Sequence, residues 1–166
     1  MTSAMLFAHR CAVLPTLLVQ AAAGAWAADG AAAAGADAVR VVKKAEAQWH
    51  PGPSAFPAGL ELTVLHGDPT QAGPFAVRLR APAGYRFPPH VHGGDEQVTL
   101  IEGDLSLGVG KTFETSALRP LAVGDFASIP ANAPHFAMTT GGTIIQVHGV
   151  GPLSITCFDE HPAHAK

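Results

Sequence analysis

Short apolar runs separated by turn residues dominate the sequence after Val39, and they restrict the fold more than any other feature. Glycine and proline are both frequent, with 18 and 14 residues in a chain of 166, and they recur between the runs. This pattern is typical of short strands joined by tight turns. The runs predict at least seven strands, over residues 60–65, 75–80, 97–101, 105–109, 125–129, 135–138 and 143–148.

Helical periodicity is weak over the same region. Residues 41–48 are the only candidate for a helix after Val39, and the stretch is short. Phe75, Val77 and Leu79 alternate with small or charged residues, as expected of a strand that buries one face. We therefore expect an all-β fold, either a closed barrel or a two-sheet sandwich, and a hydrophobic content of 48% suits a single domain of this length.

The first 27 residues are typical of an export signal. Arg10 precedes an apolar run of about 15 residues, and Ala25-Trp26-Ala27 provides a small-residue cleavage site. A transmembrane anchor or a buried helix is the alternative, but the run contains Pro15 and is shorter than the roughly 20 residues that span a bilayer. We expect a signal peptide over residues 1–27, a flexible Ala/Gly-rich leader over 28–38, the folded domain over 39–160 and a polar tail over 161–166.

A cleaved signal would place the protein in the periplasm or outside the cell, and it would change the composition of the mature chain. The mature chain would carry 9 basic and 13 acidic residues, which argues against nucleic acid and anionic membranes as partners. Cys157 would be its only cysteine, so no internal disulfide could form. We interpret Cys157 as a buried apolar residue.

Metal-ligating residue types gather at two places in the sequence. His90 and His92 are two residues apart, so on a strand both side chains can face one metal ion. A glycine pair then allows the turn that brings Glu96 back to the same side, and His135 follows a turn at the start of a later strand. Three imidazoles and one carboxylate suit one divalent transition metal, namely Fe, Mn, Ni, Co or Zn.

The two regions resemble the two motifs of the cupin superfamily. The run Gly84 to Gly103 is similar to the first motif, GX5HXHX3EX6G, at every fixed position and spacing. The run Gly124 to Thr139 resembles the second motif, GX5PXGX2HX3N, but Asn132 replaces its middle glycine and Thr139 its final asparagine. Neither departure touches a metal ligand, and asparagine tolerates the left-handed conformation that such a turn needs.

The resemblance implies a small single-domain cupin, whose fold would be a double-stranded β-helix or jelly-roll barrel with a metal in its mouth. Cupins of this kind are often dimeric, so the resemblance also implies a homodimer. His90, His92, Glu96 and His135 would take the family's ligand roles.

Four protein ligands on a six-coordinate ion leave two positions for water, substrate or O2, which favours a catalytic metal. The first hypothesis is a metal-dependent enzyme of dioxygenase type that acts on a small oxygen-donor substrate, with Glu96 also able to act as a base. The alternative is a binding or sensing module that holds a small ligand without turnover. Isomerase, decarboxylase and metal-assisted hydrolase chemistry also stays open, because the same ligands support Lewis-acid catalysis without O2.

A few other residues have two interpretations each. His148 shares a strand face with Gln146, and it is either a core histidine with satisfied hydrogen bonds or a proton-transfer residue near the metal. Arg78 and Arg80 share a face that is either solvated or, if it lines the cavity, a site for an anionic substrate. We interpret five further side chains as barrel packing: Tyr85, Phe87, Phe126, Phe136 and Met138.

Overall fold

The computed structural model describes residues 39–158, and the part from Val41 onward forms one compact unit. It contains eleven strands and two single-turn 3-10 helices within those residues. The elements are η1 (Lys44–Glu46), β1 (His50–Pro51), β2 (Glu61–His66), β3 (Gly73–Ala81), β4 (Arg86–His92), β5 (Glu96–Gly103), β6 (Leu105–Val109), η2 (Thr115–Ala117), β7 (Arg119–Leu121), β8 (Phe126–Ile129), β9 (His135–Met138), β10 (Thr143–Gly151) and β11 (Ile155–Cys157).

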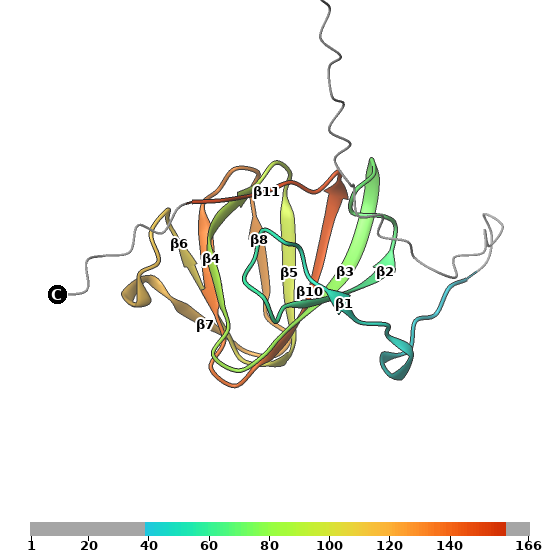
Figure 1. Cartoon of the computed structure of the whole chain (residues 1–166), viewed down its shortest axis with the longest axis horizontal. Helices are drawn as coiled ribbons and strands as arrows, with labels where there is room; N and C mark the ends of the chain where they lie inside the picture. Colours follow the sequence, from blue (N-terminus) through green and yellow to red (C-terminus); the bar gives the residue numbers. More distant parts are fainter. Residues whose placement is uncertain (1–38, 159–166) are drawn as a thin grey trace, which may run out of the picture. The chain divides into compact units, whose positions relative to one another are not determined.

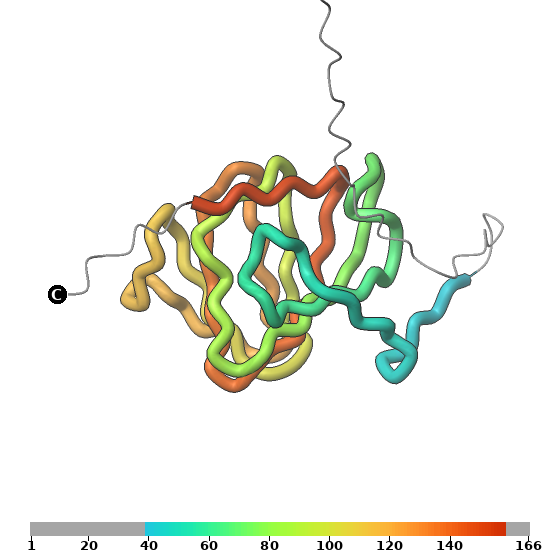
Figure 2. Tube along the Cα trace, in the orientation of Figure 1, coloured from blue at the N-terminus to red at the C-terminus, as the bar shows by residue number. Residues whose placement is uncertain are grey.

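The strands form two antiparallel sheets that face one another (Figure 1). Sheet A has the order β1-β2-β3-β10-β5-β8, and sheet B has the order β11-β4-β9-β6-β7. Strands that are consecutive in the chain often lie in different sheets, as β4 and β5 do, so the chain crosses repeatedly between the two layers (Figure 2). The predicted all-β fold with two sheets wrapped into a barrel is confirmed.

The core lies between the sheets, and strand alternation fills it. Phe75, Val77 and Leu79 on β3 are each less than one-tenth exposed, and Val77 lies opposite Val147 of β10. Val147 in turn lies opposite Val98 of β5, so one apolar row crosses three strands. Burial of each such side chain stabilises the fold by about 1.5–3 kcal/mol relative to leaving it in water.

Arg78 and Arg80, for which the sequence allowed either a solvated face or the cavity, lie on the outer face of sheet A. Arg80 Nε donates to Glu61 Oε2 at 2.6 Å, and Arg78 Nε donates to Gln146 Oε1 at 3.0 Å. Both arginines are half-buried and point away from the core side chains of β3, so they do not line the barrel interior. The interpretation of a solvated face is the correct one.

His148 lies on this outer face as well, 3.1 Å from Gln146 through its Nε2. The core face of β10 belongs to Ile145 and Val147, because side chains on a strand alternate and His148 is half-buried on the other side. The interpretation of His148 as a core histidine is therefore wrong. The same alternation removes it from the metal side of the barrel.

The predicted strands all occur, with ends shifted by a few residues, and residues 41–48 form only the short helix η1. Tyr85, Phe87 and Phe136 pack inside as expected, whereas Phe126 is 59% exposed on β8, so its assignment to barrel packing is wrong. The predicted signal peptide and leader lie outside the described residues, as does the tail over 161–166. No helix within residues 39–158 is long and apolar enough to cross a membrane.

Candidate metal centre

Two neighbouring strands of sheet B and one strand of sheet A supply the four predicted ligands. His90 and His92 lie near the end of β4, and His135 is the first residue of β9. β4 pairs with β9 so that His90 is directly opposite His135. The turn after β4 then crosses to sheet A, where Glu96 is the first residue of β5. The structure thus brings together all four side chains that the sequence singled out.

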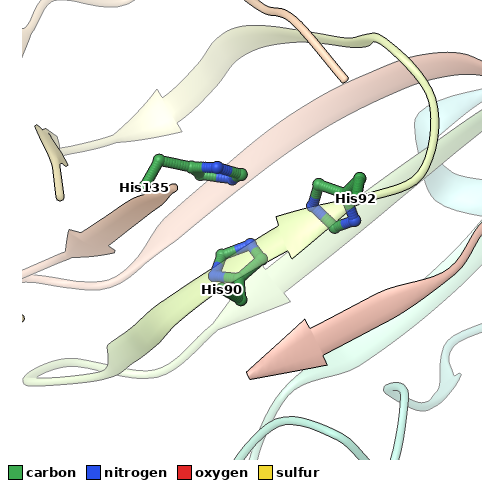
Figure 3. A group of neighbouring side chains, drawn as sticks. All are labelled: His90, His92 and His135. Atoms are coloured by element: carbon green, nitrogen blue, oxygen red, sulfur yellow. The ribbon is translucent and has the colours of Figure 1, made fainter. Parts of the chain in front are cut away.

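The three imidazole rings form a tight cluster inside the barrel (Figure 3). The centroid of the His90 ring lies 4.1 Å from that of His135 and 4.9 Å from that of His92. One nitrogen from each ring lies within 4.8 Å of the others, a spacing at which three histidines could hold one metal ion. Glu96 Oε2 lies 3.3 Å from His92 Nε2 and 3.4 Å from His135 Nε2, so the carboxylate faces the same point.

Backbone carbonyl groups orient the three rings. Nδ1 of His90 donates to Pro88 O at 2.6 Å, Nδ1 of His92 to Ser154 O at 3.0 Å, and Nδ1 of His135 to Ala133 O at 3.0 Å. A carbonyl oxygen only accepts, so each Nδ1 carries a proton, and the nitrogen that each ring has left for a metal ion is Nε2. Outer partners of this kind are typical of metal-ligating histidines.

One of these Nε2 atoms, that of His92, is buried without a hydrogen-bond partner of acceptable geometry. An unsatisfied buried polar atom costs about 1–3 kcal/mol, and a metal ion at this point would remove that cost. The four side chains are also between 4% and 8% exposed, so bulk water does not solvate them. The donor set and the unpartnered nitrogen both fit a divalent metal.

Burial and the mutual contacts of the cluster shift its pKa values. Burial, helped by the positive field of His135, lowers the pKa of His90 to about 4. Burial raises the pKa of Glu96, but the close contacts of its carboxylate with the His135 and His92 rings outweigh burial, and the net pKa falls to about 2. Burial opposes the charged form of His92, yet its contact with Glu96 leaves the pKa above the ordinary value. His90 and Glu96 are therefore in their metal-binding protonation states at neutral pH.

The turn around Asn132 fixes the loop that precedes His135. Asn132 has φ +61°, the left-handed conformation that was expected of it, and its N–H donates to His92 O at 2.8 Å. Asp95 Oδ1 accepts from Ala131 N at 2.8 Å. These bonds join the loops of the two sequence motifs.

Thr139, the second departure from the motif, has a structural role at the far end of β9. Its side chain is fully buried, and Oγ1 donates to Asp104 Oδ1 at 3.2 Å and accepts from Gly142 N at 2.9 Å. Asp104 also accepts from the N–H groups of Thr140 and Gly141. The threonine therefore stabilises the turn between β9 and β10.

Sequence reasoning missed Ser154. Its carbonyl holds His92, and its Oγ accepts from Gly93 N at 2.9 Å. The sequence contains no signal for this contact, because Ser154 is 62 residues from His92 and acts through its backbone. It reaches the centre because β11 pairs with the end of β4.

A recess of about 640 Å³ lies away from this centre, at one end of sheet A. Its polar lining comes from His66, Asp95, Gln97 and His148. None of the four clustered side chains lines it. The four clustered side chains are themselves buried, each less than one-tenth exposed.

A two-sheet antiparallel barrel with three histidines and one glutamate gathered inside it defines a cupin. The chain belongs to the family described as the ChrR Cupin-like domain, which it matches over residues 37–150. That range contains both motif regions and every strand of the barrel except the last residue of β10 and the short strand β11. No curated protein matches the chain in sequence.

Solved cupin structures are similar to the chain in fold. An RmlC-like cupin from Shewanella frigidimarina is 17% identical, with a TM-score of 0.54 over 68% of this chain and 91% of that one. An acetylacetone dioxygenase from Acinetobacter johnsonii is 20% identical, with a TM-score of 0.56 over 76% and 81%. A DMSP lyase from Ruegeria pomeroyi is 22% identical, with a TM-score of 0.54 over 73% and 64%. At these identities the likeness concerns the fold alone.

Proposed function

We propose that the protein binds one divalent transition metal through His90, His92, His135 and Glu96. The observation that carries the proposal is the orientation of the rings: three backbone carbonyls hold the Nδ1 protons, so three Nε2 atoms converge beside one carboxylate. The unpartnered Nε2 of His92 supports it. Borderline and hard donors together suit Fe, Mn, Ni, Co or Zn rather than a thiolate-bound metal.

We further propose that the protein is a metal-dependent enzyme of dioxygenase type for a small oxygen-donor substrate. A divalent ion held by His90, His92, His135 and Glu96 would supply Lewis acidity to a bound substrate. Phe56 packs against the ring of His90, and burial holds the pKa of that histidine at about 4, so His90 is neutral at neutral pH. The acetylacetone dioxygenase among the solved structures of similar fold supports the proposal of dioxygenase chemistry. The DMSP lyase among them supports the alternative of a reaction without O2.

Glu96 would have a second role in catalysis in addition to metal binding. Its carboxylate is ionised at neutral pH and lies within 3.4 Å of two histidine nitrogens. The carboxylate could take a proton from an acidic C–H or O–H group of a substrate held beside it. We therefore propose that Glu96 acts both as ligand and as base.

The test is O2 consumption by protein loaded separately with Fe(II), Mn(II), Ni(II), Co(II) and Zn(II). The substrate panel should contain β-diketones, phenols, flavonols and dicarboxylates, and product analysis should run beside the oxygen electrode. We expect turnover with at least one redox-active metal and its loss in Glu96→Gln, with His148→Ala as a matched control that keeps activity. Product formation without O2 consumption would contradict dioxygenase activity and would support a lyase, isomerase or hydrolase reaction.

The burial of the four side chains favours a second candidate, a cupin that binds or senses a small ligand without turnover. All four side chains are less than one-tenth exposed, and a binding module needs no rapid exchange of substrate and product. A ligand that co-purifies and is recovered chemically unchanged after incubation with O2 would favour this candidate. A protein that turns over no substrate with any of the five metals would also favour the binding or sensing module.

We also propose that the protein works outside the cytoplasm, in the periplasm or as a secreted protein. The support is the sequence of residues 1–27, with an apolar run and a small-residue cleavage site. Expression of the full chain followed by N-terminal sequencing of the exported form tests it. We expect a mature protein that begins at Ala28, and an uncleaved cytosolic product would contradict the proposal.

A further inference from the structure

The segment Gly52–Leu60, here called the strap, joins β1 to β2 and crosses from sheet A toward sheet B. Figures 1 and 2 show it in front of the barrel strands, lying across β5 with its tip toward β4. Gly52 N donates to Leu60 O at 2.7 Å and closes the strap into a loop. Phe56 N donates to Pro53 O at 3.0 Å and tightens its tip.

Two side chains on the side of sheet B hold the strap: Tyr85, which directly precedes β4, and Cys157 of β11. Tyr85 Oη donates to Pro57 O at 2.6 Å. Cys157 Sγ donates to Ala55 O at 3.2 Å, and Cys157 lies opposite His90 in the pairing of β11 with β4. These hydrogen bonds hold the strap at Ala55 and at Pro57, on either side of Phe56. The strap therefore lies next to β4, which carries His90 and His92.

The tip inserts Phe56 against the cluster. The ring is 9% exposed and meets the His90 ring edge to face, with centroids 4.8 Å apart and planes at 82°. It also contacts Phe87, with centroids 5.7 Å apart. No other phenylalanine or tyrosine ring within residues 39–158 makes an aromatic contact with a clustered histidine.

The strap has fewer backbone hydrogen bonds than the strands beside the cluster. Strands β4, β5 and β9 are held by ladders of backbone hydrogen bonds, whereas the strap depends on its own closing bonds and two side-chain ties. Segments with few such bonds open locally at a lower free energy than core strands. A ligand that approaches the histidines on the side of His90 must therefore displace the strap or fit beside Phe56.

We propose that the strap gates access to the histidine cluster and that Phe56 sets the size of the ligand that can enter. The gate concerns the site for which metal binding is proposed above, and it rests on that assignment for its function. Removal of the Phe56 ring opens space beside His90 without altering a ligand. Removal of the Tyr85 hydroxyl loosens the strap without altering Phe56.

Diethyl pyrocarbonate, which modifies neutral imidazole nitrogens, tests the gate on the metal-free protein. Peptide mass spectrometry gives the modification rates of His90 and His92, and the exposed His50 and His66 serve as internal standards. The variants are Phe56→Ala, Phe56→Leu and Tyr85→Phe. Phe113→Ala is the matched control, since the aromatic partner of Phe113 is Phe136. Unfolding midpoints in urea show that each variant is folded under the assay conditions.

We expect the clustered histidines of the wild type to react far more slowly than His50 and His66. Phe56→Ala should accelerate them roughly tenfold, the ratio that about 1.4 kcal/mol in opening free energy gives. Phe56→Leu and Tyr85→Phe should give smaller increases, and Phe113→Ala none. Equal rates in the wild type and in a folded Phe56→Ala or Phe56→Leu protein would overturn the gate.

A parallel titration with Zn(II) and Mn(II) separates failure of the gate from failure of the proposed function. Metal binding by the wild type with no effect of the Phe56 variants on modification rates would overturn the gate alone. A clear effect of Phe56 on the rates, in a protein that binds neither ion, would support the gate and contradict the proposed metal site.

Discussion

At the level of single residues, backbone groups orient the centre as much as the choice of ligands does. Pro88, Ser154 and Ala133 each supply a carbonyl to a different ring, and any side chain at these positions would leave that carbonyl in place. The sequence could predict the four clustered side chains because their types and spacing follow a motif. It could not predict Ser154, because a backbone acceptor has no residue-type signature.

Asn132 makes the left-handed turn before His135 testable by substitution. Its φ of +61° costs a residue with a Cβ roughly 1–2 kcal/mol unless, like asparagine, it tolerates this region. We expect Asn132→Ala to lower the free energy of unfolding by about 1 kcal/mol, and Asn132→Gly to leave it nearly unchanged. Urea titration of the two variants measures the difference, and equal stability of Ala and Gly would contradict the role of the turn.

The low pKa of Glu96 predicts a pH dependence of stability. The pKa is about 2 in the folded protein and 4.5 ordinarily, so the unfolded chain binds the proton more tightly. The ionised carboxylate therefore adds stability above pH 4.5 that is lost as the pH falls toward 2. In metal-free protein, the stability advantage of the wild type over Glu96→Gln should shrink across this window. An advantage that grows on acidification would show that the sign is wrong.

At the level of elements, alternation along the strands explains both the successful and the failed sequence predictions. Runs such as Phe75 to Leu79 carry their own pattern, so the long strands other than β4 could be predicted from apolar runs. A strand at β4 was expected only from the spacing of His90 and His92. The short strands β1, β7 and β11 could not, because two or three residues become a strand only through their partners. Alternation along a strand does not show which of its two faces points into the barrel. The faces that carry His148, Arg78 and Arg80 could therefore be assigned only from the structure.

The packing of β6 against β9 gives a prediction at this scale. A Cβ added to Gly108 would lie 2.3 Å from the ring of Phe136, which is fully buried and cannot move aside. We expect Gly108→Ala to destabilise the protein by about 1–3 kcal/mol, the usual cost of overpacking a core. Gly94→Ala is the control, since its nearest neighbour would be Val150 O at 3.5 Å. Thermal unfolding of both variants checks the contrast, and equal losses would contradict this account of the packing.

At the level of the whole molecule, the barrel brings residues from distant parts of the chain to one point. Glu96 comes from sheet A and the three histidines from sheet B, so a metal ion at the cluster would join the two layers. An ion that binds the folded state alone would stabilise it by about 2.7 kcal/mol at a concentration one hundred times its Kd. Metal binding and folding are therefore expected to be coupled.

Metal stoichiometry tests the central claim most directly. Metal-free wild type, His90→Ala and His135→Ala should be loaded with Mn(II) or Zn(II), desalted and assayed by elemental analysis, with His66→Ala and His148→Ala as histidine controls outside the cluster. We expect one equivalent of metal in the wild type and in both controls, and its loss in the two cluster variants. Unchanged metal content in His90→Ala and His135→Ala would contradict the site.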